Sequence, residues 1–190
     1  MATDPAIFLY VDPMVPRSKF ENTVTHELHH IGFASLEKEM EAKVADLPPH
    51  IRAAVDWIGA FGEGFAMLAA AGGPDIHPHA ESRPEDRARW DGDMVRFNED
   101  LRTVEAFLLD VIRQRLTSKA AIDARGGAFF GIQGPWYTVG YRMASLIETR
   151  FGRLTLLACM TDLRKLLPTY NRAATEWNRN GVAPLALWAP

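Results

Sequence analysis

The stretch IRAAVDWIGAFGEGFAMLAAA, residues 51–71, sets the character of this chain. It is far longer than a typical strand, its apolar side chains recur at helical spacing, and the Gly72-Gly73 pair after it is typical of a helix end. We therefore predict one helix over about residues 51–71. Glu63 lies in an apolar part of this helix, where a carboxylate needs a charge partner, and the glycines on both sides leave room for a close approach.

Helix signals dominate the rest of the chain. Ser18 with Glu21 and Ser82 with Glu85 are capping-box pairs that predict helix starts, and Gly32 predicts a helix end. Further helices are expected over residues 19–31, 35–46, 84–116, 135–150 and 162–178. We expect the third to break near Gly92, and the last to be capped by Asp162 and disturbed at Pro168. Loops are expected at 72–83, 126–127 and 131–135, and an apolar, non-helical tail over 181–190.

The N-terminal residues 6–11 differ from this pattern. They are apolar and rich in β-formers, and Asp12-Pro13 ends the run, so we predict one buried strand there. The sequence shows no internal repeat, low-complexity tract or linker. We expect a mainly α fold, in which residues 1–190 form a single helical domain of about six to eight helices with at most a short N-terminal β element.

Composition narrows the classes of function. The chain has 190 residues and a formal net charge of -3, so we expect no nucleic-acid partner. Cys159 is the only cysteine, which excludes an internal disulfide and a cysteine-rich zinc site. No apolar run suggests a membrane span, and the N-terminus lacks the pattern of a signal peptide. We expect a cytoplasmic location unless a signal was removed from a longer precursor; the oligomeric state is left open.

The sequence HELHH, residues 26–30, is an HExxH motif. On a helix, His26 and His30 share a face one turn apart, and two imidazoles there can bind one tetrahedral zinc ion. Glu27 can then act as general base toward a zinc-bound water, whose pKa falls to about 7. The alternative is a surface helix whose histidines bind nothing.

Two further features of this helix matter. Val24, Leu28 and Ile31 are expected to form the apolar stripe that packs the helix inward. His29 follows His26 by three residues and could replace it as a ligand, but we expect it to have a supporting or packing role.

A catalytic zinc site needs a third protein ligand. Glu63 is the best candidate, because a metal ion supplies the charge partner that an apolar helix does not. The alternative for Glu63 is a solvated position on a polar helix face. His77 and His79, in a His-Pro-His loop, are rival ligands that we expect on the surface, and His50 is weaker still.

Tyr137 and Tyr141 lie four residues apart near the start of the helix expected over 135–150. Peptide hydrolysis builds negative charge on the carbonyl oxygen, and a tyrosine hydroxyl can stabilise that charge. Tyr137, in the first turn, is our candidate donor. The alternative is that both tyrosines pack in the core with their hydroxyls satisfied.

These motifs carry a resemblance to a family. The chain resembles zinc-dependent peptidases of the gluzincin type, especially bacterial helical families first described as domains of unknown function. The shared blocks, which lie within residues 6–172, are HELHH (26–30), EGFA (63–66), GPWYTVGYRMA (134–144), IE (147–148) and FGR (151–153). The resemblance implies that His26, His30 and Glu63 bind Zn2+ and that Glu27 is the base in peptide-bond hydrolysis.

Two features depart from the gluzincin pattern. Glu63 follows the HExxH motif at a longer spacing than in the best-known members. Gluzincins also carry a β-sheet before the active helix, and only residues 6–11 could contribute to one here.

We therefore expect a zinc metallopeptidase that acts on a peptide or protein substrate. The alternative is a non-catalytic, zinc-stabilised helical binding module or a degenerate relative of such a peptidase. A third interpretation, hydrolysis of a non-peptide amide, differs only in substrate.

Overall fold

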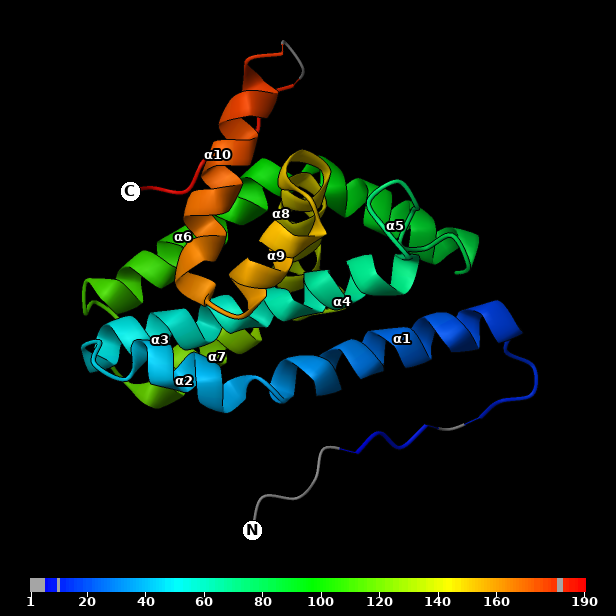
Figure 1. Ribbon diagram of the computed structural model, residues 1–190, viewed down its shortest axis with the longest axis horizontal. Helices are drawn as coiled ribbons and strands as arrows, with labels where there is room; N and C mark the ends of the chain where they lie inside the picture. Colours follow the sequence, from blue (N-terminus) through cyan, green and yellow to red (C-terminus); the bar gives the residue numbers. More distant parts are fainter. Residues whose placement is uncertain (1–5, 10, 181–182) are drawn as a thin grey trace.

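The computed structural model describes residues 6–9, 11–180 and 183–190 and is mainly helical (Figure 1). In chain order, its elements are α1 (Arg17–Ala34), α2 (Glu37–Val44), α3 (Pro49–Ile58), the 3-10 turn η1 (Gly59–Phe61), α4 (Gly62–Ala71), α5 (Pro84–Val95), α6 (Phe97–Ile112), α7 (Lys119–Gly127), α8 (Pro135–Phe151), α9 (Arg153–Met160), the 3-10 turn η2 (Leu163–Lys165) and α10 (Leu166–Asn178). None of the described residues lies in a strand. The expected mainly α fold class is confirmed.

Helix α4 packs directly against α8 through two glycines. A Cβ atom added to Gly64 would lie 2.0 Å from the backbone nitrogen of Tyr141, and one added to Gly140 would lie 2.6 Å from a carbonyl oxygen of η1. Because neither position has space for a side chain, the two backbones come into contact. The crossing brings Glu63, next to Gly64, close to the helical turn of α8 that carries Tyr137.

Helix α1 packs along α4 in the antiparallel direction (Figure 1). Near the C-terminal end of α1, the Phe33 ring approaches Gly62, where an added Cβ would lie 3.7 Å from it. Near the other end, the Asn22 side-chain amide donates a 2.9 Å hydrogen bond to the carbonyl of Ala70. These contacts fix the position of α1 along α4.

The core surrounds Trp136 of α8, which is fully buried. Its ring stacks on Trp57 at a centroid distance of 5.9 Å and meets the edge of Phe61 at 4.9 Å. Its indole nitrogen donates a 2.8 Å hydrogen bond to the carbonyl of Gly126, at the end of α7. This aromatic cluster fixes the first turn of α8 relative to α3, η1 and α7.

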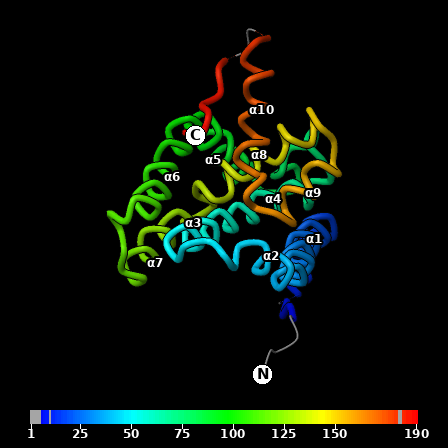
Figure 2. Tube along the Cα trace, turned by 60° about the vertical axis from the view of Figure 1, so that its left-hand side comes forward, coloured from blue at the N-terminus to red at the C-terminus, as the bar shows by residue number. Residues whose placement is uncertain are grey.

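The C-terminal segment is non-helical in residues 183–190, as expected, and it runs back along α10 (Figure 2). Leu185 and Trp188 are buried. The Tyr170 hydroxyl donates a 2.8 Å hydrogen bond to the carbonyl of Ala186, and the Asn171 side-chain oxygen accepts one of 2.8 Å from the backbone of Trp188. The segment therefore closes the core at the end of the fold away from α1.

Two predicted helices are each divided. The range 51–71 comprises α3, η1 and α4, since residues 59–61 wind into the tighter 3-10 turn. The range 84–116 divides at Arg96, whose backbone N–H donates to the carbonyl of Asp93, three residues back, instead of to a carbonyl four residues back. Gly92, where the break was expected, lies inside α5. Gly92 needs no special backbone angle there, so it is a poor indicator of a break.

Helices α7 and α9 were not predicted. Helix α7 is short and buries only Ile122 and Gly126 among its residues, so its apolar pattern is weak. The loop predicted at 126–127 is wrong, because both glycines belong to its last turn. Helix α9 starts directly after Gly152, whose φ of 82° ends α8 as expected.

The two helix starts predicted from capping boxes were wrong in detail. Ser18 lies inside α1, whose cap is Pro16, and Arg83 rather than Ser82 precedes α5; neither start has a side-chain cap hydrogen bond. Asp162 does accept a hydrogen bond of 3.3 Å from the backbone of Arg164, but it caps η2. Pro168 lies in the first turn of α10 and leaves that helix intact.

The predicted buried strand is wrong for residues 6–9 and 11; Tyr10 lies outside the described residues. The chain there is irregular, and Phe8 is 95% exposed. A strand needs a neighbouring strand to satisfy its backbone groups, and the described part of the chain offers none. The apolar composition of this segment is therefore not explained by burial within the described structure.

The stretch Pro49–Ala71 is, by length and composition, apolar enough to cross a membrane, although no apolar run in the sequence had suggested a span. In the structure 56% of its most apolar window is buried among the other helices. This packing is that of a core helix, and it places Glu63 at the contact between α1 and α4.

Candidate metal centre

The side chains of His26, His30 and Glu63 meet where α1 packs against α4. The Nε2 atoms of the two histidines are 3.1 Å apart. The Oε2 atom of Glu63 lies 3.4 Å from the first and 3.3 Å from the second. All three side chains are partly buried, with 17%, 31% and 20% of their surface exposed, so the cluster can still be reached from solvent.

The spacing of these atoms fits a tetrahedral ion. With zinc bonds of about 2.0–2.2 Å to histidine nitrogen and carboxylate oxygen, neighbouring ligand atoms of a regular tetrahedron are about 3.3–3.5 Å apart. The three observed distances, 3.1, 3.3 and 3.4 Å, correspond closely to the edges of one face. Two neutral imidazoles and one carboxylate are also ligand types that zinc prefers. The residues present therefore fit a single zinc ion with its fourth position free.

Helix geometry and the glycine contacts create this arrangement. His26 and His30 are one turn apart on α1, and their rings meet edge to face at 4.8 Å. Glu63 is in the first turn of α4, between Gly62, which admits the Phe33 ring, and Gly64, which admits α8. A side chain at Gly64 would push α8 away from the carboxylate, whereas a Cβ atom at Gly62 would make an ordinary contact with the Phe33 ring.

The charges of the cluster are coupled. Burial by itself raises the pKa of Glu63, but hydrogen bonds to His26 and His30 outweigh it and hold that pKa at about 2. The same hydrogen bond to Glu63 raises the pKa of His30, against the effect of burial. Glu63 is thus a carboxylate at any ordinary pH, as a metal ligand must be.

Glu27 and Tyr137 lie next to the cluster. Burial raises the pKa of Tyr137 to about 12, and the negative charge of Glu63, a hydrogen bond to that carboxylate and the charge of Glu27 add to the effect. The charge of Glu27 also contributes to the raised pKa of His30. Glu27 forms no ion pair with any cation of the described residues. A carboxylate on α1 and a protonated phenol on α8 therefore lie near enough to the cluster to interact with its charges.

The other candidate histidines have different partners. His77 contacts Asp91 at 2.9 Å, so it is engaged away from the cluster. His79 is 3% exposed rather than at the surface as expected, and its Nδ1 lies 2.9 Å from the hydroxyl of Ser82. His50 is on α3, at the wall of a separate cavity. His29 packs parallel to the Phe33 ring at 6.4 Å, outside the triad.

Burial lowers the pKa of His29 to about 4, with the charges of His30 and His26 as further causes. The ring is therefore neutral at physiological pH and can pack among apolar side chains. This is the supporting position expected for His29.

The apolar stripe predicted for α1 is wrong at its centre. Leu28 is 55% exposed, and no residue of α1 is fully buried. The face of α1 toward α4 carries Asn22, His26 and Phe33 instead. The metal-site histidines occupy the position that an ordinary amphipathic helix gives to aliphatic residues, which explains why the apolar pattern misled.

Tyr141 plays the packing role that the sequence left open for both tyrosines. It is buried, its ring meets the edge of Trp90 at 5.4 Å, and its hydroxyl donates a 3.3 Å hydrogen bond to the carbonyl of Ile76. Tyr137 is only partly buried and faces Glu63. The pair therefore separates into one structural tyrosine and one at the cluster.

Sequence reasoning missed a polar network beside the site. The Lys19 ammonium donates to the Ser82 hydroxyl at 3.2 Å, and Ser82 contacts His79. The other ring nitrogen of His79, Nε2, and the side-chain oxygen of Gln133, in the loop before α8, are buried without a hydrogen-bond partner among the described residues. Gln133 has a φ of 61°, which is uncommon for a residue with a side chain. The sequence does not reveal these contacts, because they join residues that are far apart in the chain.

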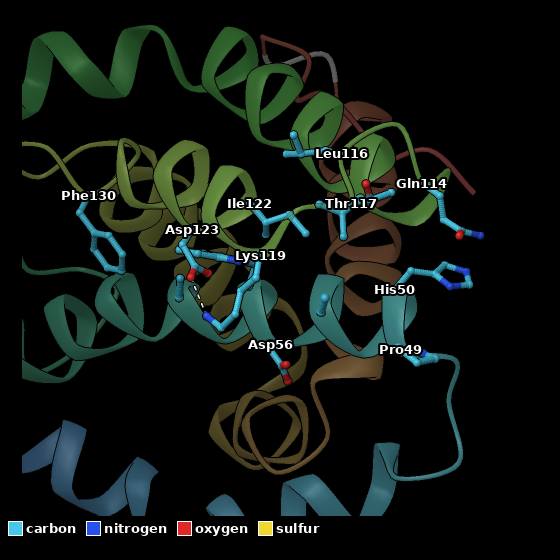
Figure 3. A pocket seen from close by; sticks show the side chains of 14 residues that line it. Pro49, His50, Asp56, Gln114, Leu116, Thr117, Lys119, Ile122, Asp123 and Phe130 are labelled. Carbon is cyan, nitrogen blue, oxygen red and sulfur yellow. Dashed lines mark hydrogen bonds and ion pairs between the residues drawn. The ribbon is translucent and has the colours of Figure 1, made fainter.

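A cavity of about 800 Å³ lies between α3 and the connection from α6 to α7 (Figure 3). Its walls include Trp57, Ile122 and Phe130, and the ion pair between Lys119 and Asp123 lies at its edge. None of the three cluster residues lines it. Its connection to the cluster is indirect, through the stacking of Trp57 on Trp136, the residue before Tyr137.

The fold and the cluster define a helical protein with two histidines and one glutamate placed so that they could hold a metal ion. A family model described as "Putative zinc dependent peptidase (DUF5700)" matches residues 1–179, nearly the whole chain, and the chain belongs to this family. The family description names zinc, and the donor set of the cluster could hold such an ion. No curated protein and no solved structure matches the chain.

Proposed function

We propose that this chain is a peptidase of the gluzincin type, in which His26, His30 and Glu63 hold a catalytic zinc ion and Glu27 is the general base. The observation that carries the proposal is the fit of three ligand atoms to one tetrahedral face, with the nearby Glu27 carboxylate forming no ion pair among the described residues. A purely structural site has no need of such a base. When bound, zinc would act as a Lewis acid toward the substrate carbonyl and bring the pKa of a water near neutrality.

The residues of the chain would supply the proton transfers. The Glu27 carboxylate takes a proton from the attacking water as the new carbon–oxygen bond forms. It then gives that proton to the departing nitrogen as the peptide carbon–nitrogen bond breaks. Glu27 is thereby restored to its starting state, and no other reactant is needed.

Tyr137 would donate a hydrogen bond to the carbonyl oxygen as negative charge develops there. Its raised pKa of about 12 keeps the phenol protonated at neutral pH, so the donor is present whenever substrate binds. Its contact with Glu63 also gives it a second task, the orientation of that ligand.

A second candidate function is a non-catalytic, zinc-stabilised binding module. One observation favours it: no described residue forms a strand beside α1 on which a substrate backbone could pair. The retained Glu27 favours the peptidase.

Replacing Glu27 by glutamine tests the choice. The change keeps the shape of the side chain and removes its ability to take a proton, so zinc content should stay at one per chain while peptide hydrolysis falls by about a hundred- to ten-thousand-fold. The assay pairs elemental analysis with cleavage of a peptide library followed by mass spectrometry. Equal cleavage by wild type and variant would exclude Glu27 as the base, and zinc-loaded wild type that cleaves no peptide would favour the binding module.

A further inference from the structure

A second cavity, of about 480 Å³, opens where the C-terminal end of α1 meets α2, α3 and the start of η2. Apolar side chains form much of its wall: Phe33, Met40, Val44, Val55 and Leu163. Carboxylates complete it, namely Glu37, Glu41, Asp56 and Asp162. No lysine or arginine lines it.

This cavity adjoins the candidate metal centre along both helices that build the centre. Phe33 follows the ligand His30 by three residues on α1, and Gly59 precedes the ligand Glu63 by four. The first spacing is about one turn of α1, or about 5 Å along its axis, and the second runs through the 3-10 turn η1 into the start of α4. The Phe33 ring also contacts Gly62, directly before Glu63.

Most of the negative charge in the cavity lacks a partner. Asp162 is paired with Arg164 at 2.8 Å and lies near Lys165 at 3.8 Å. Glu37, Glu41 and Asp56 form no ion pair within the described part of the chain. Burial raises the pKa of Asp56, and the charge of Arg52 opposes this only in part.

We infer that this cavity receives a lysine or arginine side chain of the peptide substrate, an inference that rests on the proposed peptidase function. The apolar walls match the aliphatic stem of such a side chain, and the unpaired carboxylates match its cationic end. A purely apolar side chain would desolvate the carboxylates without a partner, and an acidic one would be repelled.

The distance from the metal centre sets the substrate position. An extended peptide advances about 3.3 Å per residue, so a cavity whose wall includes Phe33, one turn of α1 after His30, is expected to take a side chain within three residues of the cleaved bond. The basic residue therefore selects the cleavage site rather than taking part in the chemistry.

The first test measures cleavage preference. The zinc-loaded wild type is incubated with a library of acetylated and amidated hexapeptides, and the products are sequenced by mass spectrometry. We expect lysine or arginine to be enriched at one position within three residues of the cleaved bond. The double variant Glu37→Gln/Glu41→Gln should lose the enrichment, and Glu37→Lys/Glu41→Lys should shift it toward acidic residues.

The second test measures binding without cleavage. The zinc-loaded Glu27→Gln protein is titrated with a fluorescein-labelled alanine hexapeptide that carries one lysine, and with a twin that carries norleucine. The lysine peptide should bind more tightly, by about two- to thirty-fold, as expected for two partly exposed charge contacts, and the difference should shrink at high salt. Adding Glu37→Gln/Glu41→Gln should remove it.

Glu39→Gln is the matched control. Glu39 lies on the same helix, is exposed, pairs with Lys43 and does not line the cavity. The inference is overturned if lysine and norleucine peptides bind equally, or if Glu39→Gln reduces lysine binding as much as the double variant. Selective lysine binding by a protein that cleaves no peptide would contradict the peptidase proposal and leave the assignment of the cavity intact. Cleavage without a preference for basic residues would support the peptidase proposal and contradict the assignment of the cavity.

Discussion

Replacing Gly64 by alanine should force α4 and α8 apart. The added Cβ would lie 2.0 Å from the nitrogen of Tyr141 and 2.3 Å from the carbonyl carbon of Gly140, and both are backbone atoms that cannot rotate away. Carbon contacts are comfortable only from about 3.5 Å, so the helices must separate by more than about 1 Å or the substituted residue must distort. Overpacking of this kind costs about 1–3 kcal/mol, which exceeds the gain of up to about 1 kcal/mol from the better helix propensity of alanine.

Thermal unfolding of the metal-free protein measures this cost. For a chain of this size, a loss of about 2 kcal/mol lowers the midpoint by about 4–8 °C. Gly92→Ala is the control, because Gly92 lies inside α5 with no atom within 4 Å of the added Cβ, and it should raise the midpoint slightly. If Gly64→Ala and Gly92→Ala have the same midpoint, the helices are not in backbone contact at Gly64 and the reasoning about how Glu63 is positioned fails.

Two other substitutions test single residues of the site. Glu63→Ala should weaken zinc binding by more than the roughly 10–100-fold that is lost when a residue hydrogen-bonded to a metal ligand is removed, while His77→Ala and His79→Ala should leave zinc content unchanged. Competition with a chelator of known affinity measures the zinc affinity of each variant. Zinc loss in either histidine variant alone would reverse the assignment. Tyr137→Phe should lower kcat by a factor that corresponds to about 3–4 kcal/mol if the hydroxyl stabilises the oxyanion; a change of about 1 kcal/mol in stability with intact turnover would identify Tyr137 as a packing residue.

The fold class and the clustering of His26, His30 and Glu63 were predictable because both depend on local chemistry. HExxH places two imidazoles on one face of a helix whatever surrounds it, and a carboxylate in an apolar helix points to a charge partner. The structure brings His26, His30 and Glu63 together as expected. The divided helices, by contrast, depend on packing around η1 and Arg96, which no local signal reports.

The orientation of α1 could not be predicted from its pattern. The histidines, Asn22 and Phe33 face α4, while Leu28 is exposed, because the metal-site side chains take the inward face. Gly64 was expected to leave room for a close approach, but the sequence did not show that the approaching element is α8, because Gly140 lies 76 residues further along the chain. For the N-terminal residues 6–9, the composition predicted a strand, but the described part of the chain contains no neighbouring strand with which it could pair.

Zinc content per chain tests the central claim most directly. The purified wild type, His26→Ala and His30→Ala are each loaded with excess zinc, dialysed and measured by elemental analysis. We predict one zinc per wild-type chain and almost none in either variant, because two remaining ligands hold zinc far more weakly than three. Full zinc content in both variants would show that the ion binds elsewhere and would contradict the metal centre described for α1 and α4.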